Sequence, residues 1–287
     1  ILSYNRKDEL RNTLTKVYEQ DYKNIEVIVV DNASADGSPE MVEYEFPDVI
    51  LIKLKENIGI AGWNKGFEIA KGEYVLVLDD DSYPGHLTID KGIKLFTDDK
   101  IGIVAFEIYN NAKKQIENYY PDSGFINTFI GCGALIRKSV IVSVKGFNEI
   151  LFLYSHEIEY SMRTLKSGFR IYFAKNIRVV HLNSPMNRGK IFNKGTADSR
   201  RTYYGVRNRL IILYLYFPLK KTIFRMARIM SGHFFNAAKS GLIRQVLRGI
   251  VSFISLLPKL SSQRNLLPIE IQKKYGFGNF AGGFFYR

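Results

Sequence analysis

The segment EYVLVLDDDS, residues 73–82, carries the strongest structural signal in this sequence. Residues 74–78 form an apolar run with the length and β-branched content of a buried strand. The run ends abruptly in Asp79, Asp80 and Asp81. Three adjacent carboxylates repel one another, so a strand that brings them to one point needs a cation there, and Mg²⁺ or Mn²⁺ prefers such oxygen ligands. The alternative interpretation is a solvated turn rich in aspartate.

Strand and helix patterns alternate before this segment. The predicted strands, separated by helical patterns, cover residues 1–4, 25–30, 49–54 and 74–78. This alternation predicts an α/β fold with a mainly parallel sheet covered by helices on both faces. Ligands bind beyond the carboxyl ends of strands in such sheets, so Asp31, which follows the second strand, is expected to share one crevice with the three aspartates. Taken alone, Asp31 is equally well explained as a helix cap or a turn residue.

The pattern changes after the aspartates. Pro84 suits the first turn of a helix, which is predicted to run to about Asp98. Residues 101–106 predict a further strand, whereas the polar and aromatic stretch 110–127 breaks the alternation. This stretch is expected to form an excursion from the sheet.

Composition limits the class of protein. A chain of 287 residues with 46% hydrophobic content can bury a large core, which excludes a disordered tail or a fibre. The single cysteine, Cys132, excludes an internal disulfide and a cysteine-based zinc site, and fits a reducing cytoplasm. Because the chain opens on Ile1 inside a predicted strand, further residues are expected to precede it.

Basic residues are concentrated in the last third of the chain. Residues 200–287 hold sixteen Lys or Arg and one acid, Glu270, whereas residues 1–199 hold 25 basic and 27 acidic residues. The uncharged runs 210–219, 229–238 and 249–258 have about half the roughly 20 residues that a membrane span needs. Apolar runs alternating with cations predict amphipathic helices that lie in the interface of an anionic membrane. The alternatives are a homo-oligomer interface or nucleic-acid binding, but the aromatic and aliphatic content argues against nucleic acid.

Four motifs in chain order resemble the family 2 glycosyltransferases of the GT-A fold. They are SYNR at residues 3–6, VDNASADGS at 30–38, NIG at 57–59 with WNKG at 63–66, and LDDD at 78–81. A lone Asp-x-Asp motif is weak evidence, but four motifs at these spacings are strong. The resemblance covers about the first 185 residues and implies a GT-A type, Rossmann-like catalytic domain, which we assign to residues 1–199, followed by a tail over residues 200–287.

The resemblance also implies a set of donor and metal contacts. Asp31 would bind the uracil or thymine ring of a UDP- or dTDP-sugar, and the aspartates at 79–81 would bind the ribose and a diphosphate-bound Mn²⁺ or Mg²⁺. The metal ligands would be Asp79 and Asp81. The residues expected to contact the nucleotide sugar are Ser3, Asn5, Arg6, Asp31, Asn57, Asn64, Asp79 and Asp80. For the loop at 56–66, the alternative is a glycine-rich connection that caps the next helix.

The segment FLYSHEIEYSMR, residues 152–163, resembles the catalytic segment of the family. An inverting transferase needs a general base to take the proton from the acceptor hydroxyl, and Glu157 aligns with the family's catalytic aspartate. The chain departs from the family pattern because His156 replaces a first acid and Glu157 is one methylene longer than aspartate. Glu159 is expected to orient acceptor hydroxyls or to cap the helix. The alternative for both glutamates is an ordinary acidic first turn.

His181 ends the apolar strand predicted over residues 177–181. It matches the family's late histidine, whose imidazole can complete the metal shell beside Asp79 and Asp81. The alternative is simply a polar residue at a strand end.

These observations predict a metal-dependent, inverting glycosyltransferase that is cytoplasmic and peripheral on the inner face of the plasma membrane. It would transfer sugar from a UDP- or dTDP-sugar to a lipid-linked or growing surface polysaccharide. The tail supports this prediction, because Tyr203-Tyr204 and Arg207-Asn208 resemble bacterial polysaccharide rhamnosyl- and galactofuranosyltransferases. One alternative, a sugar-phosphate nucleotidylyltransferase, would carry a glycine-rich, lysine-containing loop where this chain has the SYNR motif. The other is a non-catalytic glycan-binding or scaffold protein.

Overall fold

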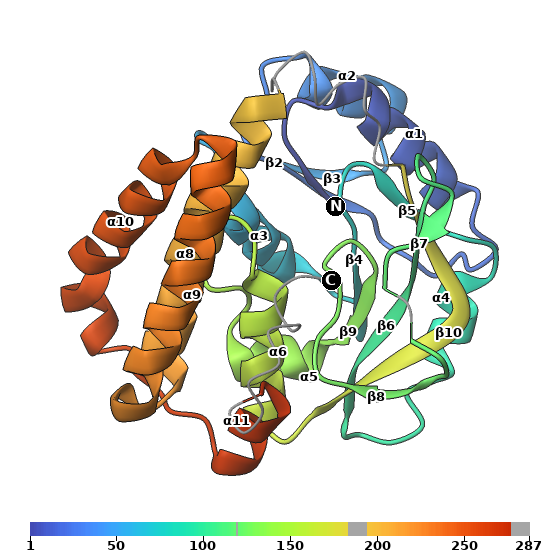
Figure 1. Ribbon diagram of the computed structural model, residues 1–287. Coiled ribbons are helices and arrows are strands. Elements are labelled where there is room, and N and C mark those ends of the chain that lie inside the picture. The colour runs from blue at the N-terminus through green and yellow to red at the C-terminus, as the bar shows by residue number, and fades with distance from the viewer. Residues whose placement is uncertain (119, 183–193, 277–287) are drawn as a thin grey trace. The chain divides into compact units, whose positions relative to one another are not determined.

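The structure, a computed structural model, describes residues 1–118, 120–182 and 194–276 (Figure 1). Contacts divide these residues into two compact units. The described part of unit 1 covers residues 1–152 and 160–182, apart from 119, and that of unit 2 covers residues 153–159 and 194–276. The division runs through helix α6 (His156–Lys166), whose first four residues belong to unit 2.

The first third of unit 1 follows the predicted alternation. Its elements are β1 (Leu2–Ser3), α1 (Lys7–Tyr18), β2 (Ile28–Asp31), α2 (Ser38–Glu45), β3 (Ile50–Lys53), the 3₁₀ turn η1 (Gly59–Ala61) and α3 (Gly62–Ile69). Strands β1, β2 and β3 pair in that order, and both pairings are parallel. Helix α1 buries Leu10, Leu14 and Val17, spaced at helical intervals, in the core that also contains Val29 of β2.

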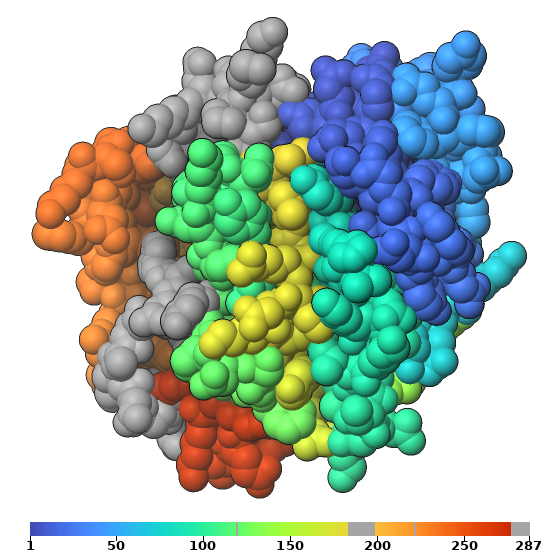
Figure 2. Space-filling view, turned by 90° about the vertical axis from the view of Figure 1, so that its right-hand side faces the viewer, coloured from blue at the N-terminus to red at the C-terminus, as the bar shows by residue number. Residues whose placement is uncertain are grey.

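A second, seven-stranded sheet completes unit 1. Its strands are β4 (Tyr74–Val77), β5 (Ser82–Pro84), β6 (Ile101–Asn110), β7 (Gln115–Ile116), β8 (Gly124–Ile126), β9 (Ala134–Arg137) and β10 (Arg170–His181). The short helices in this part of unit 1 are α4 (Thr88–Ile93), α5 (Lys138–Val144) and the 3₁₀ turn η2 (Glu149–Leu151). The strand order is β4-β9-β6-β10-β5, and a parallel bridge from Leu2 to Asp79 links it to the first sheet. In Figure 2, β10 (yellow) lies between the α4 region (teal) and the β7–β8 region (green).

The α/β class is confirmed, but the prediction of a mainly parallel sheet is wrong for the second half of unit 1. Only β6 and β10 pair in parallel there, and the other pairings are antiparallel. Parallel neighbours need a long crossover, whereas antiparallel neighbours can be joined by a turn. Residues 111–114 form such a turn between β6 and β7, within the stretch that breaks the alternation in the sequence.

The prediction of a helix that begins at Pro84 is also wrong. Residues 82–84 form β5, in which Pro84 pairs with Val179 of β10, and the helix α4 covers only residues 88–93. Strand β5 ends the strand order of its sheet. A proline, which lacks an N–H donor, is tolerated in such an edge strand.

Unit 2 is helical, as expected for the C-terminal region. Its helices are α8 (Lys194–Tyr216), α9 (Leu219–Ser240), α10 (Ile243–Ser261) and α11 (Ile269–Lys274). Helices α8 and α10 approach closely at Gly249, where an added Cβ would lie 2.9 Å from the carbonyl oxygen of Tyr203. In the part of the chain that the structure describes, no helix combines the length and apolar character that a bilayer span requires.

Candidate active site

The three aspartates sit in a tight connection between β4 and β5. The backbone N–H of Asp79 donates to Ser82 Oγ at 2.9 Å, and the N–H of Ser82 donates back to the Asp79 carbonyl at 3.2 Å. The carbonyl of Asp81 accepts from the N–H of Leu182 at 2.8 Å, which fixes the turn against the end of β10. The end of β10 is the position of His181.

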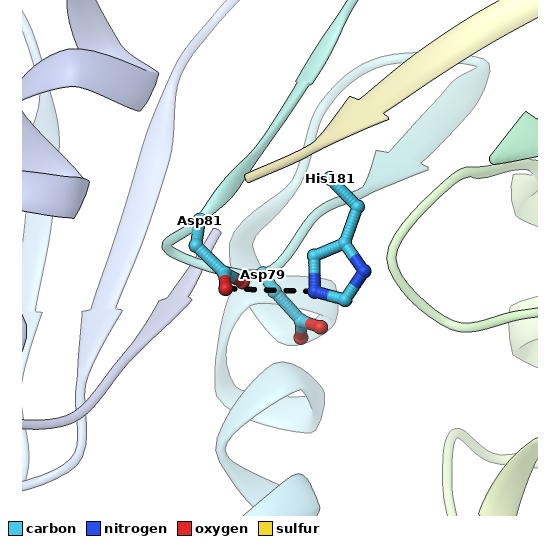
Figure 3. Close-up of side chains that lie close together, drawn as sticks. All are labelled: Asp79, Asp81 and His181. Atoms are coloured by element: carbon cyan, nitrogen blue, oxygen red, sulfur yellow. Dashed lines mark ion pairs between the residues drawn. The ribbon is translucent and has the colours of Figure 1, made fainter. Parts of the chain in front are cut away.

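Asp79, Asp81 and His181 form the predicted cluster. One ligand atom from each lies within 4.8 Å of the others, and the Nε2 atom of His181 is 3.5 Å from Asp81 Oδ2. Figure 3 shows the three side chains converging, the histidine from β10 and the aspartates from the turn after β4. Two carboxylates and an imidazole are a donor set that suits Mn²⁺. The prediction that these three residues lie close together is therefore confirmed.

Glu117 is a member of the site that sequence reasoning missed. Its Oε2 atom lies 3.1 Å from His181 Nδ1, and its Oε1 atom accepts a hydrogen bond from the side chain of Asn110. Glu117 follows β7 in the excursion after β6. No motif marks it in the sequence, and Lys113, Lys114 and Asp122 are charged residues of the same stretch, so charge alone did not single it out.

Arg6 bridges two of the aspartates. Its Nη1 atom donates to Asp80 Oδ1 at 2.9 Å and its Nη2 atom donates to Asp81 Oδ2 at 2.8 Å. Asp80, which is buried, also accepts from the backbone N–H of Tyr4 at 3.2 Å. The SYNR motif and the aspartate motif, far apart in the sequence, are thus in direct contact.

Burial and these contacts separate the pKa values of neighbouring acids. Burial raises the pKa of Asp80 to about 7, even though the positive charge of Arg6 opposes the shift. Burial acts in the same direction on Asp81, but hydrogen bonds from His181 and Arg6 outweigh it and hold the pKa of Asp81 well below its usual range. For His181, burial lowers the pKa, but hydrogen bonds to Asp81 and Glu117 outweigh it and raise the pKa to about 10. Of these two neighbouring acids, Asp81 therefore keeps its negative charge to a lower pH than Asp80.

Asp31 and Ser3 occupy paired positions on β2 and β1. Asp31 is 2% exposed, and its Oδ2 atom accepts from the N–H of Ser34 at 2.9 Å. Its Oδ1 atom and the Ser3 hydroxyl are buried, with no hydrogen-bond partner among the described residues. A buried polar atom without a partner is costly, so two of them side by side indicate a place where a ligand supplies the missing bonds.

Three predicted donor contacts hydrogen-bond to the protein backbone. Asn5, with φ of 53°, accepts from the N–H of Ala35 at 2.7 Å through Oδ1, and Asn57 accepts from the N–H of Gly59 at 2.8 Å. Asn64 both donates to and accepts from the backbone of Phe147, at 2.9 and 2.8 Å. In the structure the side-chain amides of these three residues stabilise loops. Their contact with the nucleotide sugar stays a prediction.

The predicted base and its neighbour lie in the first turn of α6, in unit 2. Glu157 is partly exposed, and its Oε2 atom is 3.4 Å from Nδ1 of the buried His156. Glu159 is fully buried and accepts a hydrogen bond from the hydroxyl of Tyr216 on α8. Its carboxylate thus anchors α6 to α8.

Helix α8 also holds the loop that leads into α6. The side-chain amide of Asn208 donates to the carbonyls of Leu153 and Tyr154 at 2.7 and 2.9 Å. Tyr154 and Ser155 have φ of 65° and 61°, a left-handed conformation that is unusual for residues other than glycine. The contact gives Asn208, singled out in the sequence, a structural role beside Glu157.

The family model described as glycosyl transferase family 2 matches residues 1–172, more than half of the chain. The chain belongs to glycosyl transferase family 2. The resemblance seen in the sequence motifs is thereby confirmed, and the chain is a glycosyltransferase. The family match does not support the nucleotidylyltransferase or the non-catalytic alternative.

Curated relatives of this family 2 glycosyltransferase are themselves named as glycosyltransferases. One is the UDP-Glc:alpha-D-GlcNAc-diphosphoundecaprenol beta-1,3-glucosyltransferase WfaP of Escherichia coli, 28% identical over 67% of this chain and 77% of that protein. Another is the putative teichuronic acid biosynthesis glycosyltransferase TuaG of Bacillus subtilis, 39% identical over 28% of this chain and 33% of that protein. The chain thus spans most of the first relative but only a third of the second.

Solved glycosyltransferases share the fold. S. aureus TarS 1–349 in complex with UDP-GlcNAc superimposes with a TM-score of 0.62 at 15% identity, covering 95% of this chain and 82% of that one. The mannosyltransferase PcManGT of Pyrobaculum calidifontis, in complex with GDP-Man and Mn²⁺, gives a TM-score of 0.58 at 17% identity, covering 91% and 76%. At these identities the likeness concerns the fold, and the GT-A fold expected from the sequence is confirmed.

Proposed function

We propose that this family 2 glycosyltransferase moves a sugar from a nucleotide-sugar donor to a hydroxyl of a lipid-linked or growing polysaccharide acceptor, with inversion at the anomeric carbon. The observation that carries the proposal is the convergence of Asp79, Asp81 and His181 after β4 and at the end of β10. The named acceptor of WfaP, a diphosphoundecaprenol-linked sugar, supports a lipid-linked acceptor.

The donor is proposed to be a UDP- or dTDP-sugar. The Oδ1 atom of Asp31, which has no hydrogen-bond partner among the described residues, can accept from the imide N–H that uracil and thymine share. Ser3, whose hydroxyl also lacks such a partner, is the residue paired with Asp31 on the neighbouring strand. Binding of such a base would satisfy both buried atoms. A guanine nucleotide, which the mannosyltransferase neighbour holds, is the alternative.

Asp79, Asp81 and His181 would hold a divalent Mn²⁺ or Mg²⁺. The ion supplies positive charge that stabilises the leaving diphosphate as the sugar–phosphate bond breaks. Arg6 fixes the orientation of Asp81 by donating to its Oδ2 atom. The chemistry of the donor set, two carboxylates and one imidazole, fits such an ion.

Glu157 is proposed to act as the general base. Its carboxylate would take the proton from the acceptor hydroxyl while that oxygen attacks the anomeric carbon from the side opposite the leaving diphosphate. His156, 3.4 Å away, limits the positions open to the carboxylate. Glu159, bonded to Tyr216, would hold the turn that carries the base. We further propose that the protein is cytoplasmic and that residues 1–199 carry catalysis, with Asn208 and Tyr216 of the following region supporting the turn that holds the base.

A thermal-shift screen of nucleotide diphosphates and nucleotide sugars, with and without Mn²⁺, tests the proposal. UDP or dTDP is expected to raise the Tm in the presence of Mn²⁺, because a ligand at 100 times its Kd stabilises a protein by about 2.7 kcal/mol. Excess EDTA is expected to remove most of this shift, and a matched EDTA sample without nucleotide controls for direct effects. Release of UDP or dTDP from the matching sugar donor confirms transfer chemistry. If no nucleotide shifts the Tm under any metal condition, the proposal is wrong.

A further inference from the structure

Helix α10 exposes a continuous apolar stripe. Ile243, Leu247, Val251 and Ile254 are 43%, 49%, 65% and 55% exposed. Their spacing of four, four and three residues places them on one face of the helix. A different face, which carries residues 246, 249, 253 and 260, is buried. The apolar surface of α10 is therefore wider than the part that packing within the protein covers.

Exposed cations flank this stripe. Arg244, Arg248 and Lys259 are exposed on α10. Helix α9 repeats the combination, because Phe224 and Phe235 are 80% and 62% exposed and the Lys239 ammonium lies 4.2 Å from the ring centroid of Phe235. Residues 219–261 contain eight Lys or Arg and not one Asp or Glu. The two helices thus combine exposed apolar side chains with Lys and Arg side chains and carry no acidic side chain.

We propose that the α10 stripe, together with the exposed phenylalanines of α9, binds to the interface of an anionic lipid bilayer. A helix of 19 residues is about 28 Å long and can lie along the surface with its apolar face among the acyl chains. Lys and Arg beside such a face are attracted to anionic headgroups. The proposal extends the proposed function, since a lipid-linked acceptor lies at such a surface, but it does not depend on catalysis.

Charge decides between a bilayer and a second copy of this chain. Pairing two copies through this face would bring cations against cations with no acid on either helix to compensate, and like charges in contact oppose association. Nucleic acid would satisfy the cations but would leave the aliphatic stripe exposed. An anionic bilayer satisfies both features.

Vesicle co-sedimentation tests this surface. The protein is expected to bind vesicles that contain about 30% phosphatidylglycerol in phosphatidylcholine at low salt, and to bind pure phosphatidylcholine at least about tenfold more weakly. The double variant Leu247→Asp/Val251→Asp is expected to weaken binding at least about tenfold, because it places charge in the centre of the stripe. The matched control is Val142→Asp on α5 of unit 1, where the valine is 71% exposed. That control is expected to bind like the unaltered protein.

A second variant separates charge from apolar burial. Arg244→Glu/Arg248→Glu keeps the stripe and is expected to lower binding to anionic vesicles at least about tenfold and to reduce its dependence on salt. The Tm of each variant shows that it is folded. The proposal is overturned if the unaltered protein does not bind anionic vesicles at low salt, or if neither double variant binds more weakly than Val142→Asp. The proposal is also overturned if light scattering shows that the unaltered protein is a dimer and that the Leu247→Asp/Val251→Asp variant is a monomer.

A second, independent observation concerns Glu117. The segment after β7 is tied to β6 by three hydrogen bonds: Glu117 N–H to the Ile108 carbonyl at 2.8 Å, Ile108 N–H to Asn118 Oδ1 at 2.7 Å, and Asn118 Nδ2 to the Phe106 carbonyl at 2.8 Å. The Glu117 carboxylate, held at Oε1 by Asn110, is therefore fixed with Oε2 at 3.1 Å from His181 Nδ1.

We infer that Glu117 is a positioning residue for His181. If a divalent ion displaces the proton on Nε2, the atom that faces Asp81, a carboxylate that accepts from Nδ1–H keeps the proton on Nδ1 and leaves the Nε2 lone pair for the metal. Carboxylate partners of this kind orient a ligating imidazole and increase its basicity. The inference rests on the metal site of the proposed function.

Mn²⁺ titration followed by electron paramagnetic resonance tests this role without any turnover. Glu117→Gln is expected to raise the Kd for Mn²⁺ by about 10- to 100-fold, whereas Glu117→Asp is expected to restore part of the affinity. The matched control is Glu107→Gln on β6, whose carboxylate pairs with Arg178 at 2.9 Å and not with His181. If the unaltered protein binds no Mn²⁺, the proposed metal site is wrong. If it binds and Glu117→Gln binds equally well, or Glu107→Gln weakens binding as much, only the role of Glu117 is wrong.

Discussion

Replacing Asp81 with asparagine is expected to lower kcat by about 100- to 1,000-fold, the loss that follows removal of one strong electrostatic contact at a developing charge. Asp81 is 1% exposed, accepts from Arg6 and faces His181, so its charge is the centre of the cluster. Asparagine keeps the size of the side chain but removes its negative charge and replaces one acceptor oxygen with an NH₂ donor. The measurement is steady-state release of nucleoside diphosphate at saturating donor and Mn²⁺.

The control for this prediction is Asp90→Asn on α4. Asp90 pairs with Lys94 one turn away at the protein surface and is not part of the cluster. Its replacement is expected to leave kcat within about twofold, because exposed ion pairs contribute little. Comparable activity of Asp81→Asn and Asp90→Asn, with both variants folded, would contradict the assignment of Asp81.

Glu157→Gln is expected to reduce kcat by about 100- to 10,000-fold, the range for loss of a general acid or base. Glutamine has nearly the same shape but cannot accept the proton of the acceptor hydroxyl. The Tm shift produced by UDP with Mn²⁺ is expected to stay unchanged, because donor binding is assigned to residues of unit 1. Acceptor-dependent turnover and the thermal shift are measured on the same preparation.

The alternative for Glu157 is an acidic first turn that interacts with the α6 dipole, and it predicts a different result. In that case Glu157→Gln would lower stability by about 0.3–1 kcal/mol and leave turnover almost intact. Glu149→Gln, at an exposed acid of η2, is the matched control. Retention of more than about a tenth of the activity in Glu157→Gln would exclude its role as the base.

The cluster could be predicted because its members end strands. Asp79 and Asp81 follow β4, and His181 ends β10. The strand end itself indicated a site at the aspartates, whereas His181 was included because it matches the family's late histidine. In the structure, β5 begins directly after Asp81 and pairs with β10 so that Ser82 lies opposite His181. Local motifs and strand ends are the information that a single sequence holds most reliably.

The antiparallel half of the sheet could not be predicted in the same way. Strand β6 is buried at nearly every position, so it has no alternating pattern that would indicate a face or a partner. The contacts of Arg6 with Asp80 and of Glu117 with His181 join residues 74 and 64 positions apart. Such pairings depend on strand order, which the sequence pattern left open.

The tail shows a similar division. The apolar runs and the cations between them predict amphipathic helices, but they do not predict which face of each helix is buried. Arg209 and His233 are buried, 3.0 Å apart, whereas Val251 is 65% exposed. Burial here depends on which helices pack together and not on the polarity of single residues.

Anomalous diffraction at the manganese edge, from crystals grown with Mn²⁺ and UDP, tests the central claim most directly. The account predicts one strong peak within bonding distance of Asp81 and His181 Nε2, in contact with the diphosphate, with the uracil ring against Asp31. A diphosphate bound with no manganese at these residues, or a manganese peak bound by other side chains only, would contradict it.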